Sequence, residues 1–364
     1  MTRLTRLRLN DFRNYRQLDV KLSGRHVCLF GANGSGKTNL IEAISQFSPG
    51  RGLRSVAIGD LSRAGSGTGW TVSADLVPQE GADPHRIGVA LERSGPAAKR
   101  LHRLDGTNAT AAEIAELVRV VWLTPAMDRV FAGGASDRRR FFDRQVMAHI
   151  PAHGPVSADY EKAMRERNAL LEHSLPDPAW LAAIEGRMAE AGAAIIANRQ
   201  LILARMQDAL DDRPEGAFPK ADLQLDGPVD GAAEALASRW AEMRRVDAKA
   251  GRTLSGPHRT DLSVIHRPTG LPAAQCSTGQ QKALLIGLIL ASAAALAARI
   301  DGPAPLLLLD EAAAHLDADR RAALFDALDA LGGQAWLTGT DRELFEAFGE
   351  RAERIEIRAG EVVG

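Results

Sequence analysis

The segment that constrains this chain most is a glycine-rich loop placed between a strand pattern and a helix pattern. Residues 27–30 read Val-Cys-Leu-Phe, a short and wholly apolar run of the kind that forms a buried strand. Within residues 37–46, Leu40, Ile41 and Ile44 recur on one face of an expected helix. The loop between them matches the pattern GxxxxGK(S/T) in full and reads Gly31-Ala32-Asn33-Gly34-Ser35-Gly36-Lys37-Thr38. A strand, this loop and a helix in that order predict a phosphate-binding site in an α/β protein.

Each part of the loop has an expected chemical role. Glycines let backbone N–H groups surround the β- and γ-phosphates of a nucleotide, and the helix N-terminus adds positive potential. Lys37, a candidate catalytic residue, is expected to reach the terminal phosphates, and Thr38 to place its hydroxyl on Mg²⁺. All eight loop residues are therefore candidate contacts for ATP with Mg²⁺. The guanine-binding sequence Asn-Lys-x-Asp does not occur in the chain, which disfavours a GTPase.

A second apolar run supplies the carboxylates that such a site needs. Leu306–Leu309 is followed by Asp310 and Glu311, which places both acids at the end of an expected buried strand. A carboxylate in that position holds Mg²⁺ through water, which is the role expected for Asp310. Glu311 is expected to polarise the attacking water as general base. Many apolar strands end in acidic residues, so this run alone is only moderate evidence for a metal site. Together with the phosphate-binding loop at 31–38 it becomes strong evidence.

A third motif opens a long apolar helix that lies between these two motifs in the sequence. The residues Ser277-Thr278-Gly279-Gln280-Gln281-Lys282 precede Ala283–Ala298, which is sixteen residues without a charge. A serine hydroxyl, a glycine N–H group and a helix N-terminus together form an anion site. The alternative is an ordinary helix cap by Ser277 or Thr278. The apolar run is shorter than the ~20 residues of a membrane span and is rich in Ala and Gly, so we expect a buried core helix.

The distribution of strand and helix patterns along the sequence divides the chain into three segments. Residues 1–135 and 251–364 carry short strand patterns, whereas strand patterns vanish over 136–250 and long helices are expected there. One apolar stripe of that middle segment consists of Ile184, Met188, Ala191, Ile195, Ile202 and Met206. We therefore expect 136–250 to be a helical lobe inserted between the two halves of an α/β lobe. At about 115 residues, the insert is too short for long coiled-coil arms.

Charge and cysteine usage limit the partners and the compartment. The net charge is −1, but residues 1–60 hold ten Lys or Arg against four Asp or Glu, and residues 299–364 hold seven against fourteen. A basic face is one feature of proteins that bind a phosphate-rich partner, although segregated surface charge explains the pattern equally well. Cys28 is expected in the core, neither cysteine forms a metal-binding motif, and His149 and His153 are expected at the surface. With no signal-peptide pattern at the start, a cytoplasmic protein without membrane partners is expected.

The motifs resemble those of the ABC ATPases. Ser277–Lys282 is similar to the serine-glycine signature of that class, and the stretch Ala313-Ala314-His315-Leu316-Asp317 is similar to its adjacent loop ending in Leu-Asp. The resemblance implies an ABC-type P-loop ATPase head with an inserted helical lobe. It also implies that Ser277, Gly279, Gln280 and Asp317 serve the nucleotide of a partner protomer, so that ATP induces a homodimer.

Within this class the chain resembles the RecF family. The stretches that carry the likeness are Leu4–Tyr15, Gly31–Ile44, Gly50–Ser55, Leu123–Pro125, Arg138–Asp143 and Ser255–Leu262. They occur in order over nearly the whole chain. The resemblance implies a two-lobed ATPase that binds DNA near single-strand gaps, helps to load recombinase through RecR and RecO, and supports the SOS response.

Two departures weaken the alternative of a nucleotide-binding subunit of an ABC transporter. Transporters carry a Gln after the strand before the helical region, and the stretch Leu123-Thr124-Pro125-Ala126 has none. They also carry a His after the strand that follows the Asp-Glu pair, where this chain reads Leu337-Thr338-Gly339-Thr340-Asp341. Either Thr338 or Thr340 bonds the γ-phosphate in place of that histidine, or both are turn residues. The departures are consistent with slow hydrolysis.

The expected DNA contacts are basic clusters. Their members are Arg51, Arg54, Arg138, Arg139, Arg140, Arg244, Arg245, Lys249 and Arg252. Phosphate contacts need such residues, although each cluster alone is more often a solvated or ion-paired face. Aromatic residues make up only 5% of the chain, so a base-stacking platform for single strands is poorly supported and duplex or gapped DNA is favoured.

Overall fold

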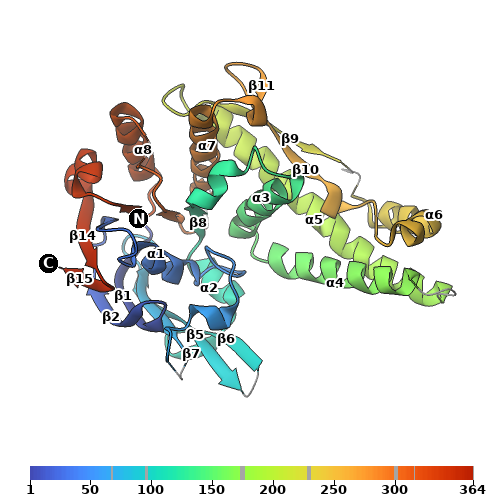
Figure 1. The fold of residues 1–364 in the computed structure, drawn as a ribbon, viewed down its shortest axis with the longest axis horizontal. Coiled ribbons are helices and arrows are strands. Elements are labelled where there is room, and N and C mark those ends of the chain that lie inside the picture. The colour runs from blue at the N-terminus through green and yellow to red at the C-terminus, as the bar shows by residue number, and fades with distance from the viewer. Residues whose placement is uncertain are drawn as a thin grey trace. The chain divides into compact units, whose positions relative to one another are not determined.

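The computed structural model describes residues 1–66, 69–94, 97–172, 177–227, 231–298, 302–314 and 316–363 (Figure 1). Contacts divide the chain into two compact units. The first consists of Met1–Asp128, Ala209–Lys220 and Lys282–Gly364, and the second of Arg129–Asp208 and Ala221–Gln281. This division differs from the bounds expected from the sequence, because residues 251–281 cluster with the helical segment and residues 209–220 do not.

A mostly parallel sheet forms the centre of the first unit. Its strand order is β15-β14-β3-β13-β12-β8, and β15 alone in this order runs antiparallel to its neighbour. The strands are β3 (His26–Phe30), β8 (Val120–Leu123), β12 (Leu306–Leu309), β13 (Ala335–Gly339), β14 (Ala352–Arg358) and β15 (Glu361–Val363). Strands β3, β8, β12 and β13 are almost continuously apolar and buried, as expected for strands covered on both faces. Cys28 is fully buried in β3, as expected, and burial raises the pKa of its thiol.

A second, antiparallel sheet belongs to the same unit. Its strand order is β2-β1-β4-β5-β6-β7, with β1 (Arg3–Phe12), β2 (Tyr15–Lys21), β4 (Thr71–Val77), β5 (His85–Ser94), β6 (Ala97–Leu104) and β7 (Thr107–Ala109). Leu4, Leu7 and Leu9 are all fully buried, although strict alternation would put Leu4 and Leu7 on opposite faces. A register shift against β4 between Leu4 and Arg6 restores the common face.

The two sheets of the first unit share one hydrophobic core. The core joins residues of both sheets with Leu40, Ile41 and Ile44 of helix α1 (Lys37–Ser45), which are buried as the sequence predicts. Other helices with residues in this unit are η1 (Ile58–Leu61), α2 (Ala111–Leu117), η2 (Pro125–Arg129), α7 (Thr278–Ala297), α8 (Ala318–Ala330) and η5 (Arg342–Arg351), together with the end of α5 (Pro178–Asp212).

Helix α7 is the apolar helix that the sequence predicts to be part of the core. Within the part of the chain that the structure describes, it is the one helix long and apolar enough to cross a membrane by length and composition. The structure buries 72% of its most apolar window, and every residue from Ala283 to Leu290 is buried. A core helix is thus confirmed.

The second unit is built on four helices and a small sheet. The helices are α3 (Ala135–His149), α4 (His153–Leu171), α5 (Pro178–Asp212) and α6 (Ala233–Ala250). The short turns η3 (Pro257–Arg259) and η4 (Ala273–Gln275) come after α6 and lie before β10 and before α7. The predicted apolar stripe lies on α5, where Ile184, Met188, Ile195, Ile202 and Met206 are buried.

The expectation that strand patterns vanish over 136–250 is wrong. Strand β9 (Ala221–Asp226) pairs antiparallel with β10 (Asp261–His266), and β10 pairs with β11 (Leu271–Pro272). Within β9, Ala221, Leu223 and Leu225 alternate with polar residues that are exposed. The signal was therefore present but short, and the strand depends on a partner that lies 35 or more residues further along the chain.

The expectation that His149 and His153 lie at the surface is also wrong. Both are buried, and the Nε2 atom of His153 lies 3.2 Å from Oδ1 of Asp143. The same carboxylate accepts hydrogen bonds from Arg199 at 2.7 and 2.8 Å. Sequence spacing gave no sign of this partnership, because Arg199 is 56 residues away from Asp143.

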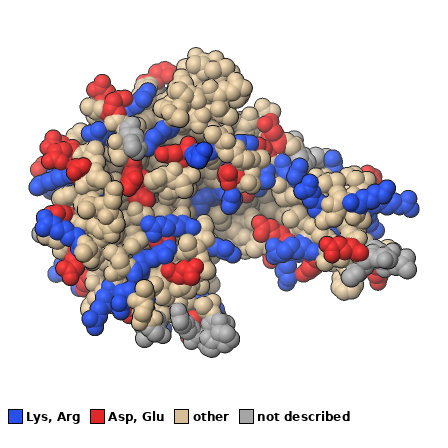
Figure 2. All heavy atoms as spheres, in the orientation of Figure 1, with Lys and Arg blue, Asp and Glu red and all other residues tan. Residues whose placement is uncertain are grey.

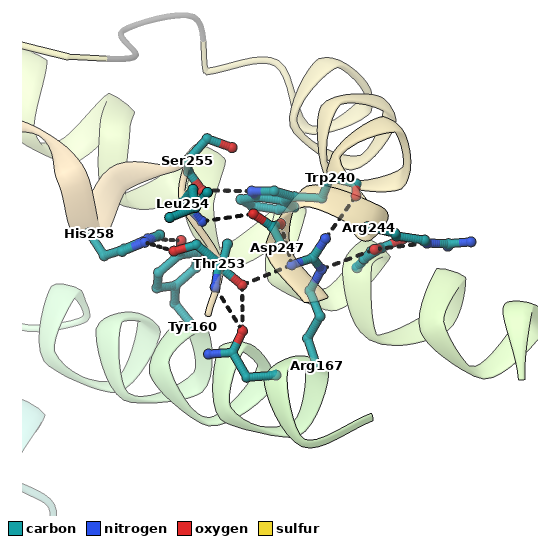
Figure 3. Close-up of polar contacts among 11 residues, drawn as sticks. Tyr160, Arg167, Trp240, Arg244, Asp247, Thr253, Leu254, Ser255 and His258 are labelled. Carbon is teal, nitrogen blue, oxygen red and sulfur yellow. Dashed lines mark hydrogen bonds and ion pairs between the residues drawn. The ribbon is translucent and has the colours of Figure 1, made fainter. Parts of the chain in front are cut away.

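A buried polar network ties α4, α5 and α6 of the second unit to the segment 253–258 (Figure 3). The guanidinium of Arg167 is fully buried and donates to Glu185 Oε1 at 3.0 Å, to Asp247 Oδ2 at 2.7 Å and to the carbonyl of Trp240 at 2.8 Å. It also donates to the hydroxyl of Thr253 at 2.9 Å. A buried charge is tolerated when it is paired and hydrogen-bonded in this way.

Replacing Arg167 with methionine is expected to lower the free energy of unfolding by about 3–5 kcal/mol, because it leaves two buried carboxylates without their shared cation. The matched control is Arg165→Met on the same helix, since Arg165 is exposed and its nearest carboxylate oxygen, on Glu161, is 3.8 Å away. That change is expected to cost less than about 0.5 kcal/mol. Urea unfolding followed by circular dichroism measures both values, and equal values would refute a structural role for the network.

Candidate nucleotide site

The glycine-rich loop lies between β3 and α1, at the carboxyl end of the parallel sheet, where ligands bind in open α/β sheets. Gly31 and Gly36 have φ values of +139° and +118°, which residues other than glycine rarely adopt. A Cβ atom on Gly31 would also lie 2.3 Å from the carbonyl oxygen of Ile357, and one on Gly36 would lie 2.6 Å from Nδ2 of Asn14. Both glycines are thus required by the close approach of neighbouring strands and turns.

The lysine of the loop is held over the loop backbone. The ammonium group of Lys37 donates to the carbonyl oxygens of Gly31 at 2.7 Å and Ala32 at 2.9 Å. Burial lowers the pKa of Lys37, and the nearby carboxylates of Glu311, Asp310 and Asp341 oppose that shift. The hydroxyl of Ser35 is buried and has no hydrogen-bond partner among the residues that the structure describes. The loop therefore holds a cation and a free polar group in position for an anionic ligand.

The two side chains predicted to hold Mg²⁺ are in contact in the structure. Thr38, the second residue of α1, donates from its hydroxyl to Oδ1 of Asp310 at 2.9 Å. Asp310 follows β12, so residues 272 positions apart in sequence are in contact. A hydroxyl and a carboxylate are the hard oxygen ligands that Mg²⁺ takes beside nucleotide phosphates, and these two side chains fit such an ion.

Thr338 joins this pair to the predicted general base. Its hydroxyl donates to the same Oδ1 atom of Asp310 at 2.7 Å and accepts from the backbone N–H of Glu311 at 2.9 Å. Strand β13, which carries Thr338, lies between β3 and β12 in the sheet. The sheet order therefore brings together the loop threonine, the Asp-Glu pair and Thr338.

The serine-glycine motif lies at the start of α7, where residues 277–281 belong to the second unit and Lys282 to the first. Ser277 donates its N–H to Oε1 of Gln280 at 2.9 Å and accepts from the N–H of Gln280 at 3.3 Å, which is a reciprocal helix cap. The cap that the alternative interpretation predicts is thus present. Ser277 and Gly279 are exposed, and a Cβ atom on Gly279 would meet nothing within 4 Å.

Asp317 of the Leu-Asp loop caps a different helix. Its carboxylate accepts from the N–H of Arg320 at 2.8 Å at the start of α8, and the residue is exposed. His315, in the same loop, lies outside the described residues.

Contacts from the β1–β2 turn support the loop and were not predicted individually. Asn14 donates to the carbonyl of Ser35 at 3.3 Å, and the hydroxyl of Tyr15 donates to the carbonyl of Gly36 at 3.1 Å. Asn39 of α1 donates to Oδ1 of Asn14 at 2.8 Å. These contacts span 21 or more residues of sequence, so periodicity gave no sign of them, although the likeness of Leu4–Tyr15 to RecF had singled out the segment.

Several arginines that were candidate DNA contacts are paired within the chain. Arg54 donates to Glu42 Oε2 at 3.0 Å, Arg138 to Asp261 Oδ2 at 2.6 Å and Arg244 to Glu185 Oε2 at 2.6 Å. Further internal contacts run from Arg139 to the carbonyl of Thr260 and from Arg140 to Asp137. Arg54 and Arg140 are nevertheless exposed, as are Arg51, Arg245, Lys249 and Arg252. Figure 2 shows Lys and Arg interspersed with Asp and Glu over the face that it presents.

Comparisons with known proteins agree with this geometry. The family described as RecF/RecN/SMC N terminal domain matches residues 3–361. The DNA replication and repair protein RecF of Rhizobium etli (strain CIAT 652) is 50% identical to this chain, over 99% of the chain and 98% of its own length. The chain belongs to the RecF family. RecF of Brucella suis biovar 1 (strain 1330) is also 50% identical, over 99% of this chain and 96% of its own. A transporter subunit is therefore not favoured.

Solved structures show that the fold is shared with RecF and with SMC heads. The structure described as the recombination mediator protein RecF-ATPrS in the RecFOR pathway has a TM-score of 0.83 at 22% identity, covering 99% of this chain and 97% of its own. The Smc head domain from Pyrococcus furiosus, bound to the C-terminal domain of ScpA, has a TM-score of 0.54 at 17% identity, covering 100% and 96%. The expected α/β head of the ABC-type class is thus confirmed.

Proposed function

We propose that this RecF-family protein is an ATPase that clamps DNA as an ATP-induced homodimer. It acts in DNA replication, in recombinational repair at single-strand gaps and in the SOS response. The observation that carries the proposal is the contact of Thr38 with Asp310 beside the loop that holds Lys37. That contact joins the phosphate-binding and carboxylate halves of the proposed ATPase site, and the relatives' names, DNA replication and repair protein RecF, support a role in DNA repair.

Within the proposed site, the backbone of Gly31–Gly36 and the ammonium of Lys37 bind the β- and γ-phosphates of ATP. Thr38 and Asp310 hold Mg²⁺, which neutralises charge on the phosphate oxygens when it is bound. Glu311 accepts a proton from the attacking water. Asn33 and Gly34 are exposed, so the loop is accessible to a ligand as large as a nucleotide.

The proposed dimer brings Ser277, Gly279, Gln280 and Asp317 of one protomer to the nucleotide of its partner. The exposure of Ser277, Gly279 and Asp317 supports this, as does the open space around Gly279. The cap that Ser277 makes to its own helix does not compete with it, because a serine oxygen that accepts from the helix still has a proton to donate.

Duplex or gapped DNA is the proposed partner, contacted through phosphates by exposed basic residues such as Arg51 and Arg245. RecR and RecO are proposed partners by family, since a RecF structure of the same fold is described as part of the RecFOR pathway. We place these interactions in the cytoplasm. Hydrolysis stimulated by DNA would separate this function from that of a transporter subunit.

Replacing Lys37 with methionine tests the proposal. The affinity for ATP is expected to fall by about 100-fold, or about 2.7 kcal/mol, because the main positive charge facing the phosphates is lost. Retention of DNA that depends on ATP is expected to vanish with it. Titration with labelled ATP and a gel shift on gapped, single-stranded and double-stranded DNA measure the two effects.

The matched control is Lys21→Met, which removes an exposed lysine of β2. It is expected to leave ATP affinity unchanged. If the Lys37 variant keeps its fold by circular dichroism and binds ATP like the parent protein, the assignment of the loop is wrong.

A further inference from the structure

The hydroxyl of Thr338 has two partners, and both belong to the Asp-Glu pair. Thr338 is 1% exposed, and its Oγ1 atom lies 2.7 Å from Oδ1 of Asp310 and 2.9 Å from the backbone nitrogen of Glu311. Because Asp310 is an acceptor when ionised, the single hydroxyl proton is used toward that carboxylate. A lone pair of the same oxygen receives the N–H of Glu311.

The backbone of Glu311 needs such a partner. Its φ value is +52°, a left-handed conformation that is uncommon for residues other than glycine, asparagine and aspartate. Residues persist in this conformation only where their surroundings determine it, and such residues cluster at active sites. The hydrogen bond from the Glu311 amide to Thr338 fixes the peptide unit immediately before the α-carbon of Glu311. It thereby sets the direction in which the carboxylate of Glu311 leaves the chain.

The carboxylate of Asp310 is fixed from two sides. Oδ1 accepts from the hydroxyl of Thr38 at 2.9 Å as well as from that of Thr338. The two donors come from α1 and β13, and Asp310 follows β12. If the Thr338 hydroxyl were removed, the carboxylate of Asp310 would keep the hydrogen bond from Thr38 but lose the one from Thr338.

Thr340, which follows β13, is engaged differently. The hydroxyl of Thr340 donates to Oδ2 of Asp341 at 2.6 Å in an exposed contact, and its carbonyl accepts from the N–H of Gly31 at 3.1 Å. Thr340 therefore makes no contact with the Asp-Glu pair among those that the structure describes.

We propose that Thr338 is a positioning residue for hydrolysis, whose hydroxyl orients Glu311 and Asp310 together instead of binding the γ-phosphate. The inference rests on the proposed ATPase function. It assigns to a buried side chain of β13 the coupling of the metal-binding carboxylate to the general base. A mutation at Thr338 should thus affect the rate of hydrolysis more than the binding of ATP.

The test compares Thr338→Val, which keeps the shape and removes the hydroxyl, with Thr338→Ser, which keeps the hydroxyl. In the valine variant kcat is expected to fall by about 10- to 100-fold, as for other outer-shell partners of a metal site. The Kd for ATP without Mg²⁺ is expected to change by less than about threefold, and the Mg²⁺ concentration for half-maximal activity to rise. The serine variant is expected to restore most of the activity. A valine variant that loses ATP affinity as strongly as kcat would overturn the inference in favour of a γ-phosphate contact.

A second readout does not depend on ATP. Hydrogen–deuterium exchange of peptides covering residues 306–314 reports on the amide of Glu311. It is expected to quicken in Thr338→Val and to return toward the parent rate in Thr338→Ser, because only the serine variant retains the acceptor. Unchanged exchange in the valine variant would refute the positioning role. If the parent protein does not hydrolyse ATP, the proposed function fails while the exchange experiment still decides the role of Thr338.

Discussion

Replacing Glu311 with glutamine is expected to slow ATP hydrolysis by about 10²- to 10⁴-fold and to leave ATP binding intact. Glutamine has the size of glutamate, but its amide does not accept a proton from the attacking water. Lys37 donates to the carbonyl of Gly31 and Thr38 donates to Asp310, and neither hydrogen bond involves the Glu311 side chain, so the ligand should still bind. With hydrolysis blocked, the ATP-bound dimer and its complex with DNA should persist longer.

Release of phosphate under single-turnover conditions measures the rate, and equilibrium titration measures the affinity. Glu343→Gln is a suitable control because Glu343 is an exposed glutamate of η5 in the same unit. It is expected to keep the parent rate. Unchanged turnover in the Glu311 variant would move the general base elsewhere, and the turn at 338–341 would be the first place to search.

Mixing two inactive variants is expected to restore activity if the sites are shared between protomers. Ser277→Arg should leave the glycine-rich loop of each protomer able to bind ATP, but it should block dimerisation and hydrolysis. The reason is that an arginine side chain does not fit where a γ-phosphate meets a helix N-terminus. Lys37→Met should prevent the glycine-rich loop of its own protomer from binding ATP and should leave the serine-glycine motif intact. A mixed dimer then carries one intact loop opposite one intact serine-glycine motif, which makes one working site.

Ser277 also caps its own helix, so a control must separate the cap from the partner contact. Ser277→Ala removes the cap hydroxyl without adding bulk and is expected to cost about 1 kcal/mol of stability. Light scattering and ATP turnover should show dimers and partial activity in the mixture and in neither variant alone. A mixture that stays inactive while both variants remain folded would refute the shared site.

The segments that form the candidate nucleotide site were predicted well from sequence, because local rules determine them. An apolar run, a loop whose glycines require positive φ, and a helix with one apolar face are each encoded over a few residues, as in 27–46. The Asp-Glu pair was found in the same way. Thr38 and Asp310 were each assigned to Mg²⁺ from their own motifs, whereas the strand order that brings them into contact was not predicted.

What escaped prediction depends on partners distant in sequence. Strand β9 forms against β10, His153 is buried beside Asp143 because Arg199 completes the group, and the hydroxyl of Thr338 meets Asp310 across neighbouring strands. Charge counts also left open which basic residues are paired within the chain, and arginines such as Arg54, Arg138 and Arg244 form ion pairs with carboxylates that the fold brings near. A count of basic residues does not show which of them are already paired.

The order of strands in the parallel sheet has a consequence for the newly made chain. Strand β3, which precedes the nucleotide loop, has as neighbours β13 and β14, and these come from residues 335–358. At about 5–20 residues per second, a ribosome needs roughly 15 to 60 s to make the intervening stretch. During that time β3 leaves the ribosome with neither neighbour available, as an apolar segment open to mispairing. A chain cut short before residue 335 therefore keeps every loop residue while losing both strands that pair with β3.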